Sequence, residues 1–171
     1  MDFVVRAMTE EDARAIADWH YEGEYAFYDF ERDPDDLAEL LDPGRWGVAF
    51  FSVGDDDGQL VGFFEFLSEG DVVEIGLGLR PDFTGKGYGL SLVEAGITFA
   101  RQRFSPRVFR VRVAAFNERA AKVYRRAGFR VTGRTEQIAN GAAVEFLDME
   151  RYASPDALTP WPPLPEGEGE H

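Results

Sequence analysis

The sequence predicts a mixed α/β fold, a single domain in which helices lie on both faces of a largely antiparallel, twisted sheet. Three observations lead to this class. Short apolar runs of the strand type dominate the chain. Two of these runs, residues 46–53 and 59–68, flank an acidic turn that ends in Gly58, which is the pattern of a hairpin. The helical patterns stand singly between strands, which is typical of a mixed sheet.

Capping residues and turn residues indicate where the individual helices and strands begin and end. In chain order we expect strands at residues 3–8, 46–53, 59–68, 71–80, 107–116, 129–138 and 142–151, and helices at residues 10–20, 33–41, 90–104 and 118–127. Thr9 is placed to cap the first helix, and Asp33 or Asp35 lies near the start of the second. Asn140 and Gly141 form a turn before the last strand.

Length and composition predict one folded domain followed by a tail. With 171 residues, 44% of them hydrophobic, the chain can bury a sizeable core, and we place the domain at residues 1–152. Residues 153–171 contain five prolines and show no hydrophobic alternation. We therefore predict a tail that is disordered or held on the surface through Trp161.

Composition and charge exclude several classes of function. The chain has no cysteine, which excludes a disulfide framework, a thiolate zinc site and a cysteine nucleophile. It shows no signal-peptide pattern and no run of transmembrane length, so we expect a cytoplasmic protein. The net charge of −14 argues against nucleic acid and against an anionic membrane as partners. This charge fits either solubility or attraction of a cationic amine, and a homodimer is left open.

Residues 77–89, with the sequence LGLRPDFTGKGYG, carry the clearest functional signal. An apolar run is followed by a loop with glycine at positions 85, 87 and 89, and a helical pattern begins directly afterwards. Alternating glycines allow backbone N–H groups to converge on an anion. The first turn of the following helix adds unpaired N–H donors and the positive end of its dipole. The segment therefore predicts a cradle for a phosphate group.

The spacing of these glycines disfavours two familiar phosphate-binding motifs. A P-loop requires Ser or Thr directly after its lysine, whereas Lys86 is followed by Gly87. The dinucleotide fingerprint requires the spacing G-x-G-x-x-G, whereas the three glycines here give G-x-G-x-G.

The loop instead resembles the acyl-CoA-binding motif of the GNAT superfamily of acetyl-CoA-dependent N-acetyltransferases. That motif has Gln or Arg three residues before a glycine, and a second small residue two positions after it. Thr84 stands at the Gln/Arg position, and Gly87 and Gly89 are the two small residues. Threonine departs from the pattern, although its hydroxyl can still donate. The resemblance implies that the pyrophosphate of acetyl-CoA lies on Thr84, Gly85, Lys86, Gly87, Tyr88 and Gly89.

Residues 117–129, with the sequence NERAAKVYRRAGF, resemble a later motif of the same superfamily. By spacing, Asn117 caps the start of a short helix and Gly128 caps its end. The resemblance implies that Asn117 bonds the pantetheine amides and that Tyr124 is the acid that protonates the departing thiolate. An N-cap alone would also explain Asn117, and core packing would explain Tyr124. The resemblance spans residues 3–151.

The strand at residues 71–80 provides the candidate base. Its even-numbered positions place Glu74 on the face opposite Val73 and Ile75, together with two glycines that leave the main chain accessible to a ligand. The resemblance implies that the pantetheine arm pairs with Leu77, Gly78 and Leu79. Glu74 is then the candidate general base, directly or through a water molecule. The alternative is a carboxylate that is solvated or paired with arginine.

Residues 19–33 supply the candidate acceptor site. This segment alternates aromatic and acidic residues, and such a combination suits an ammonium group. We predict that Glu22, Glu24 and Tyr25 contact the acceptor. The alternative is a cap over the core. His20 could serve as a base, but a histidine beside Trp19 is more often a packing residue.

The sequence thus favours an N-acetyltransferase that moves an acetyl group directly from acetyl-CoA to a primary amine, either a small metabolite or a peptide N-terminus. We expect no metal. A non-catalytic acyl-CoA-binding sensor or scaffold of the same fold is the alternative, and transfer of a longer acyl group is also left open.

Overall fold

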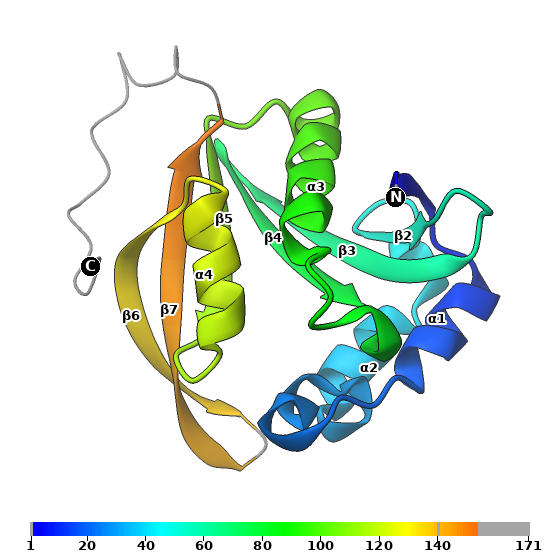
Figure 1. Cartoon of the computed structure of the whole chain (residues 1–171), viewed down its shortest axis with the longest axis horizontal. Coiled ribbons are helices and arrows are strands. Elements are labelled where there is room, and N and C mark those ends of the chain that lie inside the picture. Colours follow the sequence, from blue (N-terminus) through cyan, green and yellow to red (C-terminus); the bar gives the residue numbers. More distant parts are fainter. Residues whose placement is uncertain (1, 140, 154–171) are drawn as a thin grey trace. The chain divides into compact units, whose positions relative to one another are not determined.

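The computed structural model describes residues 2–139 and 141–153 and contains a seven-stranded sheet (Figure 1). Its strands are β1 (Val4–Ala7), β2 (Phe50–Gly54), β3 (Leu60–Glu69), β4 (Val72–Leu79), β5 (Val108–Ala114), β6 (Arg130–Ala139) and β7 (Ala142–Tyr152). Their order in the sheet is β1-β2-β3-β4-β5-β7-β6. The pairs β1–β2, β2–β3 and β5–β7 are antiparallel, and β4–β5 is parallel. The predicted mixed α/β class with a mostly antiparallel sheet is therefore confirmed.

The helices fall between the strands, as the sequence predicts. They are α1 (Glu10–Ala17), α2 (Pro34–Leu40), α3 (Gly89–Phe104) and α4 (Glu118–Arg126), with 3-10 helices η1 (Gly23–Tyr28), η2 (Phe30–Arg32), η3 (Pro43–Arg45) and η4 (Pro81–Phe83). The predicted turn at Asn140 and the predicted tail after Ala153 lie outside the described residues.

Two element boundaries differ from the prediction by three residues or more. Helix α1 ends at Ala17 rather than at residue 20, because the N–H groups of Asp18 and Trp19 form tighter 3-10-type hydrogen bonds, of 3.1 Å each. Strand β2 begins at Phe50 rather than at residue 46. The reason is a turn in which Ala49 donates a backbone hydrogen bond of 2.8 Å to Arg45.

The described residues form two compact units that interleave along the chain. Unit 1 comprises residues 2–65, 77–88, 139 and 141, and unit 2 comprises residues 66–76, 89–138 and 142–153. Strands β3 and β4 each contain a boundary between the units. A single domain over residues 1–152 stays a prediction.

In unit 1, a capping box fixes the start of α1. The Thr9 hydroxyl accepts from the Asp12 N–H at 3.1 Å, and the Asp12 carboxylate accepts from the Thr9 N–H at 3.2 Å. The same carboxylate accepts from the Ser52 hydroxyl at 2.8 Å and is paired with Arg6. Burial pushes the pKa of Asp12 upward, but the hydrogen bonds from Arg6, Ser52 and Thr9 hold it below its ordinary value. Asp12 is thus ionised and links α1 to β1 and β2.

The apolar core of unit 1 forms where α1 and α2 meet the sheet. Thr9 caps α1 as predicted, and Asp33, one of the two residues predicted near the start of α2, caps that helix. The buried members of this core are Met8, Ala13, Ile16, Leu40, Phe50 and Phe63. Phe63 also packs against Trp19 and Phe30, whose rings belong to the segment after α1 and to η2.

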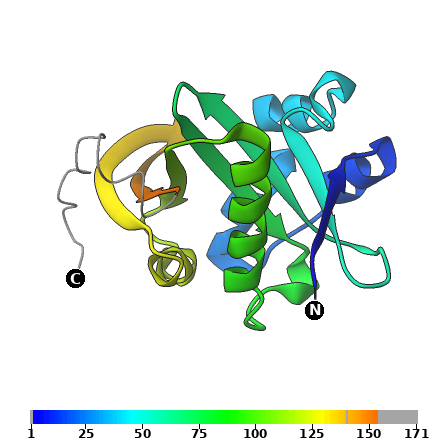
Figure 2. The ribbon, with the colours of Figure 1, turned by 90° about the horizontal axis from the view of Figure 1, so that it is seen from above.

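In unit 2, helices α3 and α4 pack closely at the start of α3. A Cβ atom at Gly89 would lie 3.3 Å from Cγ2 of Val123, so a glycine at this position allows the close approach. Figure 2 shows α3 from the side and α4 end-on, so the two axes run in different directions. Strands β5 and β7 pair over seven residue positions, from Val108 opposite Tyr152 to Ala114 opposite Phe146.

Helix α4 ends in a Schellman motif that corrects one prediction. The C-cap is Ala127, and Gly128 is the residue after it, with a φ of +92°. The N–H of Gly128 donates to the carbonyl oxygen of Arg125, and that of Phe129 donates to Tyr124, both at 3.0 Å. The rings of Tyr124 and Phe129 form the accompanying apolar contact, edge to face at 5.9 Å between centroids. The glycine supplies the left-handed conformation that the motif needs.

Candidate functional site

The end of β4 carries the strand positions predicted to bind pantetheine. A Cβ atom at Gly78 would lie 2.5 Å from the ring of Phe63 and 3.3 Å from the hydroxyl oxygen of Tyr21. The prediction that this glycine leaves open space for a ligand is therefore wrong, because a neighbouring aromatic ring already fills it. Only a residue without a side chain fits at this position. The pairing of a ligand with the main chain of Leu77, Gly78 and Leu79 stays a prediction.

Tyr21 joins the segment after α1 to the end of β4. Its hydroxyl donates to the carbonyl oxygen of Leu79 at 2.7 Å, and its backbone N–H donates to Oδ1 of Asp29 at 2.9 Å. Burial, and then the charge of Asp29, raise the pKa of the Tyr21 phenol well above its ordinary value. The phenol therefore stays protonated and acts as a permanent donor. Sequence reasoning missed Tyr21, because nothing in the local pattern marks a partner so distant in the chain.

The loop after β4 is stiffened by its own side chains. Arg80 forms two hydrogen bonds with the carboxylate of Asp82, at 2.7 and 3.0 Å, and a third with the carbonyl oxygen of Leu60 at 2.8 Å. Its guanidinium lies over the ring of Phe83, 4.7 Å from the centroid. The hydrogen bonds to Asp82 raise the pKa of Arg80, and those from Arg80 lower the pKa of Asp82. These contacts of Arg80 thus hold the loop in place just before the glycine segment.

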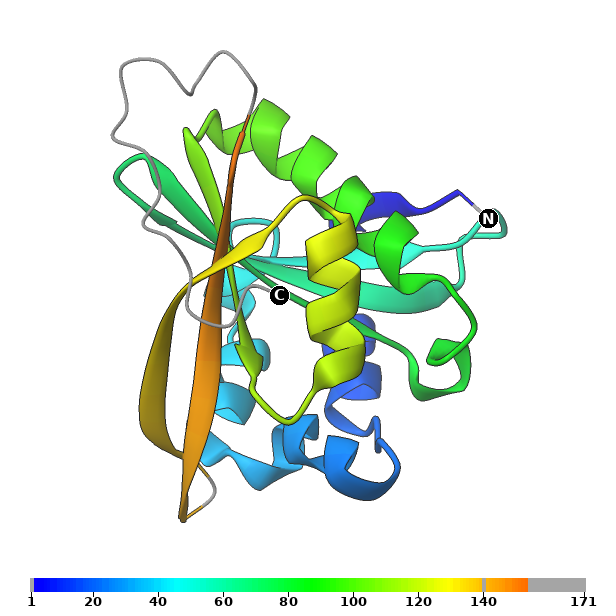
Figure 3. The same cartoon turned by 60° about the vertical axis from the view of Figure 1, so that its left-hand side comes forward.

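The predicted cradle follows directly and has the backbone conformation of an anion-binding nest. Gly85 and Gly87 both lie in the left-handed region, with φ of +71° and +86°. The surroundings of Gly87 are open, since a Cβ atom there would meet no atom within 4 Å. Figure 3 shows residues 80–88 leading from the end of β4 into α3, which begins at Gly89. The local geometry can therefore present several N–H groups to one anion.

The side chains of the cradle have different surroundings. The hydroxyl of Thr84 donates to the carbonyl oxygen of Pro81 at 2.7 Å, so this donor holds the loop together rather than pointing at an anion. Lys86 is exposed. The ring of Tyr88 packs edge-on against Phe3, with a distance of 6.4 Å between centroids. Of these three side chains, that of Lys86 is the exposed one, and it carries a positive charge.

In unit 2, Glu74 is held by two arginines. Its Oε1 accepts from Nε of Arg110 at 3.0 Å and lies 3.5 Å from Nε of Arg112. Arg112 also binds the carboxylate of Asp148 at 3.0 Å. Burial alone would lower the pKa of Arg110, but the pairing with Glu74 raises it above its ordinary value. The structure thus has the arginine-paired carboxylate that the sequence left open, and a catalytic role for Glu74 stays a prediction.

The register of β4 with β5 ends at Glu74. Among the described residues, the paired positions are Val72 with Val108, Val73 with Phe109 and Glu74 with Arg110. Beyond this point β5 continues in its pairing with β7. Within unit 2, the candidate base therefore marks the last paired position of the parallel ladder.

Asn117 and Tyr124 lie at the start and in the interior of α4. The side-chain oxygen of Asn117 accepts from the N–H of Ala120 at 3.1 Å, which confirms the predicted N-cap. Tyr124 is 8% exposed and packs against Phe129. The structure thus supplies the N-cap explanation for Asn117 and the packing explanation for Tyr124. Their proposed contacts with the cofactor stay predictions.

The predicted acceptor residues lie around η1 in unit 1. Glu22 precedes this helix and Glu24 is in its first turn, and both side chains are exposed. Tyr25 is half-buried. Asp29, in contrast, is buried and bonded to Tyr21 and His20, so it belongs to the framework of this segment. Glu22 and Glu24 are therefore exposed carboxylates, whereas Asp29 is a buried carboxylate that holds the segment together.

Within the part of the chain that the structure describes, no helix is both long and apolar enough to cross a membrane. The cytoplasmic location and the homodimer stay predictions.

Comparisons with known proteins point to one family. A family model described as an acetyltransferase (GNAT) domain matches residues 2–130. The mycothiol acetyltransferase of Propionibacterium freudenreichii is 33% identical over 153 residues, which is 87% of this chain. The chain covers only 42% of that relative's length.

Solved structures share the fold. The spermidine N-acetyltransferase of Vibrio cholerae, in complex with CoA and spermine, superimposes with a TM-score of 0.73 at 23% identity, covering 89% of this chain and 96% of that one. A single-residue variant of the same enzyme gives a TM-score of 0.70 at 22% identity, covering 92% and 97%. With the match of the family model over residues 2–130, this chain belongs to the GNAT acetyltransferase family.

Proposed function

We propose that this protein is an N-acetyltransferase that moves an acetyl group from acetyl-CoA to a primary amine. The observation that carries the proposal is the nest at Gly85 and Gly87, placed directly before the first turn of α3. Family membership supports the same conclusion. One relative is named as a mycothiol acetyltransferase and one structural neighbour as a spermidine N-acetyltransferase, which fits the proposed reaction class.

In this proposal the cofactor is bound mainly through the main chain. The N–H groups from Gly85 to Gly89 receive the pyrophosphate, because the N–H of Thr84 already donates to the carbonyl oxygen of Pro81 at 3.2 Å, and Lys86 adds a positive charge. The hydroxyl of Thr84 takes no direct part, because it is bonded to Pro81. Leu77 and Gly78 offer main-chain groups to the pantetheine arm, and the carbonyl oxygen of Leu79 already accepts one hydrogen bond from Tyr21.

The chemistry requires one acyl transfer, the loss of two protons from the amine and the gain of one proton by the thiolate. An alkyl ammonium has a pKa of about 10 and must lose a proton before its nitrogen can attack. The C–N bond then forms, the C–S bond breaks, and the nitrogen releases a second proton while the thiolate gains one. We assign proton removal to Glu74, directly or through water, and proton donation to Tyr124. Because both arginine contacts of Glu74 involve Oε1, the proton route runs through Oε2.

The acceptor is, in this proposal, a cationic amine. The exposed carboxylates of Glu22 and Glu24 and the half-buried ring of Tyr25 lie together at the start of η1. Such a surface attracts an ammonium group electrostatically. The net charge of −14 adds a long-range field of the same sign. Both a small metabolite and a peptide N-terminus fit this description.

A screen of primary amines with acetyl-CoA tests the proposed function directly. Released CoA is measured with a thiol reagent, and the chain itself contributes no background because it has no cysteine. We expect thiol release that depends on both protein and amine, with a mass gain of one acetyl group on the amine. Binding of acetyl-CoA without amine-dependent release for any amine would instead support the non-catalytic alternative.

A further inference from the structure

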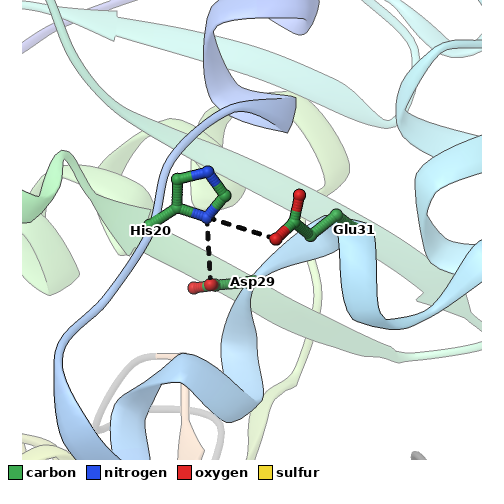
Figure 4. Close-up of side chains that lie close together, drawn as sticks. All are labelled: His20, Asp29 and Glu31. Carbon is green, nitrogen blue, oxygen red and sulfur yellow. Dashed lines mark hydrogen bonds and ion pairs between the residues drawn. The ribbon is translucent and has the colours of Figure 1, made fainter.

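Three potential metal ligands meet in the segment that follows α1 (Figure 4). His20 lies just after the helix, Asp29 stands between η1 and η2, and Glu31 belongs to η2. Nδ1 of His20 is 3.2 Å from Oδ2 of Asp29 and 3.4 Å from Oε1 of Glu31. All three ligand atoms lie within 4.8 Å of one another. One nitrogen and two carboxylate oxygens thus converge on a small volume.

The distances within this cluster fit hydrogen bonding and also fit metal coordination. A charge-assisted hydrogen bond between a protonated imidazole and a carboxylate is typically about 2.7–2.9 Å long. Both distances from Nδ1 exceed that range. Ligand atoms that each lie about 2.1 Å from a metal are separated by roughly 3.0 Å in octahedral and roughly 3.4 Å in tetrahedral coordination. The 3.2 Å contact with Asp29 has the length of an ordinary N–H···O hydrogen bond, and both separations from Nδ1 also match the edges of a coordination shell.

The surroundings orient the ligands as a metal site requires. The side chain of Asp29 is only 5% exposed, and its other oxygen, Oδ1, accepts the backbone N–H of Tyr21 at 2.9 Å. This second contact turns Oδ2 toward His20, as outer-shell partners of metal ligands do. The side chains of His20 and Glu31 are 58% and 60% exposed, which leaves a path for an ion to enter. Two carboxylates balance the charge of a divalent cation.

We propose that His20, Asp29 and Glu31 bind a divalent transition-metal ion of the zinc class. An imidazole nitrogen with two carboxylate oxygens is a ligand set for Zn²⁺ and Co²⁺, whereas Mg²⁺ and Ca²⁺ prefer oxygen ligands alone. The ion would close the segment from residue 20 to residue 31. Through Asp29 and Tyr21, it would also stiffen the connection to Leu79. The inference departs from the sequence expectation that no metal is bound, and it does not depend on the proposed transferase activity.

Isothermal titration calorimetry with Zn²⁺ tests this proposal, after the protein has been freed of metal with a chelator. We expect one strong site in the wild-type protein and much weaker binding of Mg²⁺. His20→Gln and Glu31→Gln should each weaken Zn²⁺ binding by about tenfold or more, since each removes one of three ligands. Asp29 is left unchanged, because its second oxygen also holds Tyr21.

Two matched controls separate this site from general metal binding. Glu24→Gln removes the same charge from an exposed position in the same segment, and His171→Ala removes the other histidine of the chain. Both should retain wild-type affinity. The absorption bands of bound Co²⁺ provide a second measurement, because they report direct coordination and should be lost in His20→Gln. Absence of a strong Zn²⁺ site in the wild-type protein, or unchanged binding in both site variants, would overturn the proposal.

Discussion

The hydroxyl of Tyr21 donates a 2.7 Å hydrogen bond to the carbonyl oxygen of Leu79, which lies 58 residues later in the chain. Because Asp29 fixes the backbone of Tyr21, this one phenol connects the acidic segment after α1 to the strand end that precedes the cradle. Removal of the hydroxyl leaves a half-buried carbonyl group without this donor. Loss of this hydrogen bond should therefore lower the free energy of unfolding by a measurable amount.

Tyr21→Phe should lower the free energy of unfolding by about 1–2 kcal/mol, the usual cost of losing one hydrogen bond in a partly buried setting. Unfolding in urea measures the change. Tyr88→Phe is the matched control, because it removes a phenolic hydroxyl while keeping the ring contacts with Phe3 and Phe83. Equal stability of wild type and Tyr21→Phe would mean that the bond to Leu79 contributes nothing to the fold.

Asp12 should make stability depend on pH in the acid range. Its pKa is lowered in the folded protein, so its contribution is complete above the ordinary carboxyl pKa of about 3.9 and is lost as the pH falls toward the folded value. Asp12→Asn should therefore cost about 2–3 kcal/mol at pH 7 and clearly less at pH 3. Urea unfolding at both pH values measures the two differences, and an equal difference at both would contradict this role of the charge.

The helices and strands of this fold were predictable wherever they depend on residues close together in the sequence. Thr9 and Asn117 cap their helices as the sequence predicts, and Asp33 is one of the two residues predicted near the start of α2, because an N-cap depends only on the next three residues. The hairpin of β2 and β3 follows from the turn between two apolar runs. These local features fixed the order of the elements and the place of the glycine loop.

The contacts that decide the site's geometry are not local. Arg110 lies 36 residues after Glu74, yet it determines how that carboxylate is held. The ring of Phe63 fills the space beside Gly78, although the spacing of glycines on β4 suggested an open face. Such pairings depend on which strands become neighbours in the sheet. The order of the strands cannot be read from a single sequence.

Tyr124→Phe tests whether this phenol acts in the reaction. The variant keeps the ring contact with Phe129 and should therefore remain folded and keep its affinity for CoA. We expect kcat to fall by about 10- to 100-fold, since a thiolate leaves fairly well without an acid. Steady-state kinetics with an accepted amine gives the comparison. An unchanged kcat would leave Tyr124 as a packing residue.

Glu22 and Glu24 should set the affinity for the amine. Replacing both with Gln should raise the KM for the amine and leave the KM for acetyl-CoA nearly unchanged, because only the amine is cationic. The KM of the wild-type protein for the amine should also rise more steeply with ionic strength than that of the variant.

A control for the double substitution of Glu22 and Glu24 removes two negative charges from another part of the chain. Asp56→Asn with Asp57→Asn changes the exposed turn between β2 and β3 by the same two charges. If this control raises the KM for the amine as much as the glutamate pair does, the effect belongs to the net charge of the protein. If neither pair has an effect, the acceptor binds elsewhere.

The central claim is that the nest before α3 holds the pyrophosphate of CoA, and Gly87→Val tests it against a matched control. Gly58, in the turn after β2, has a φ of +80° and open surroundings, nearly the same as Gly87 with +86°. Valine should therefore cost each site a similar strain of about 1–2 kcal/mol, but only at Gly87 does it block the approach of a phosphate.

Thermal unfolding with and without CoA is the deciding measurement. At a CoA concentration of about 100 times Kd, mass action should raise the Tm of the wild-type protein by about 5–10 °C. Gly58→Val should have a lower Tm but the same rise with CoA, and Gly87→Val should lose the rise. An equal rise in both variants would contradict the cradle assignment and, with it, the proposed mode of cofactor binding.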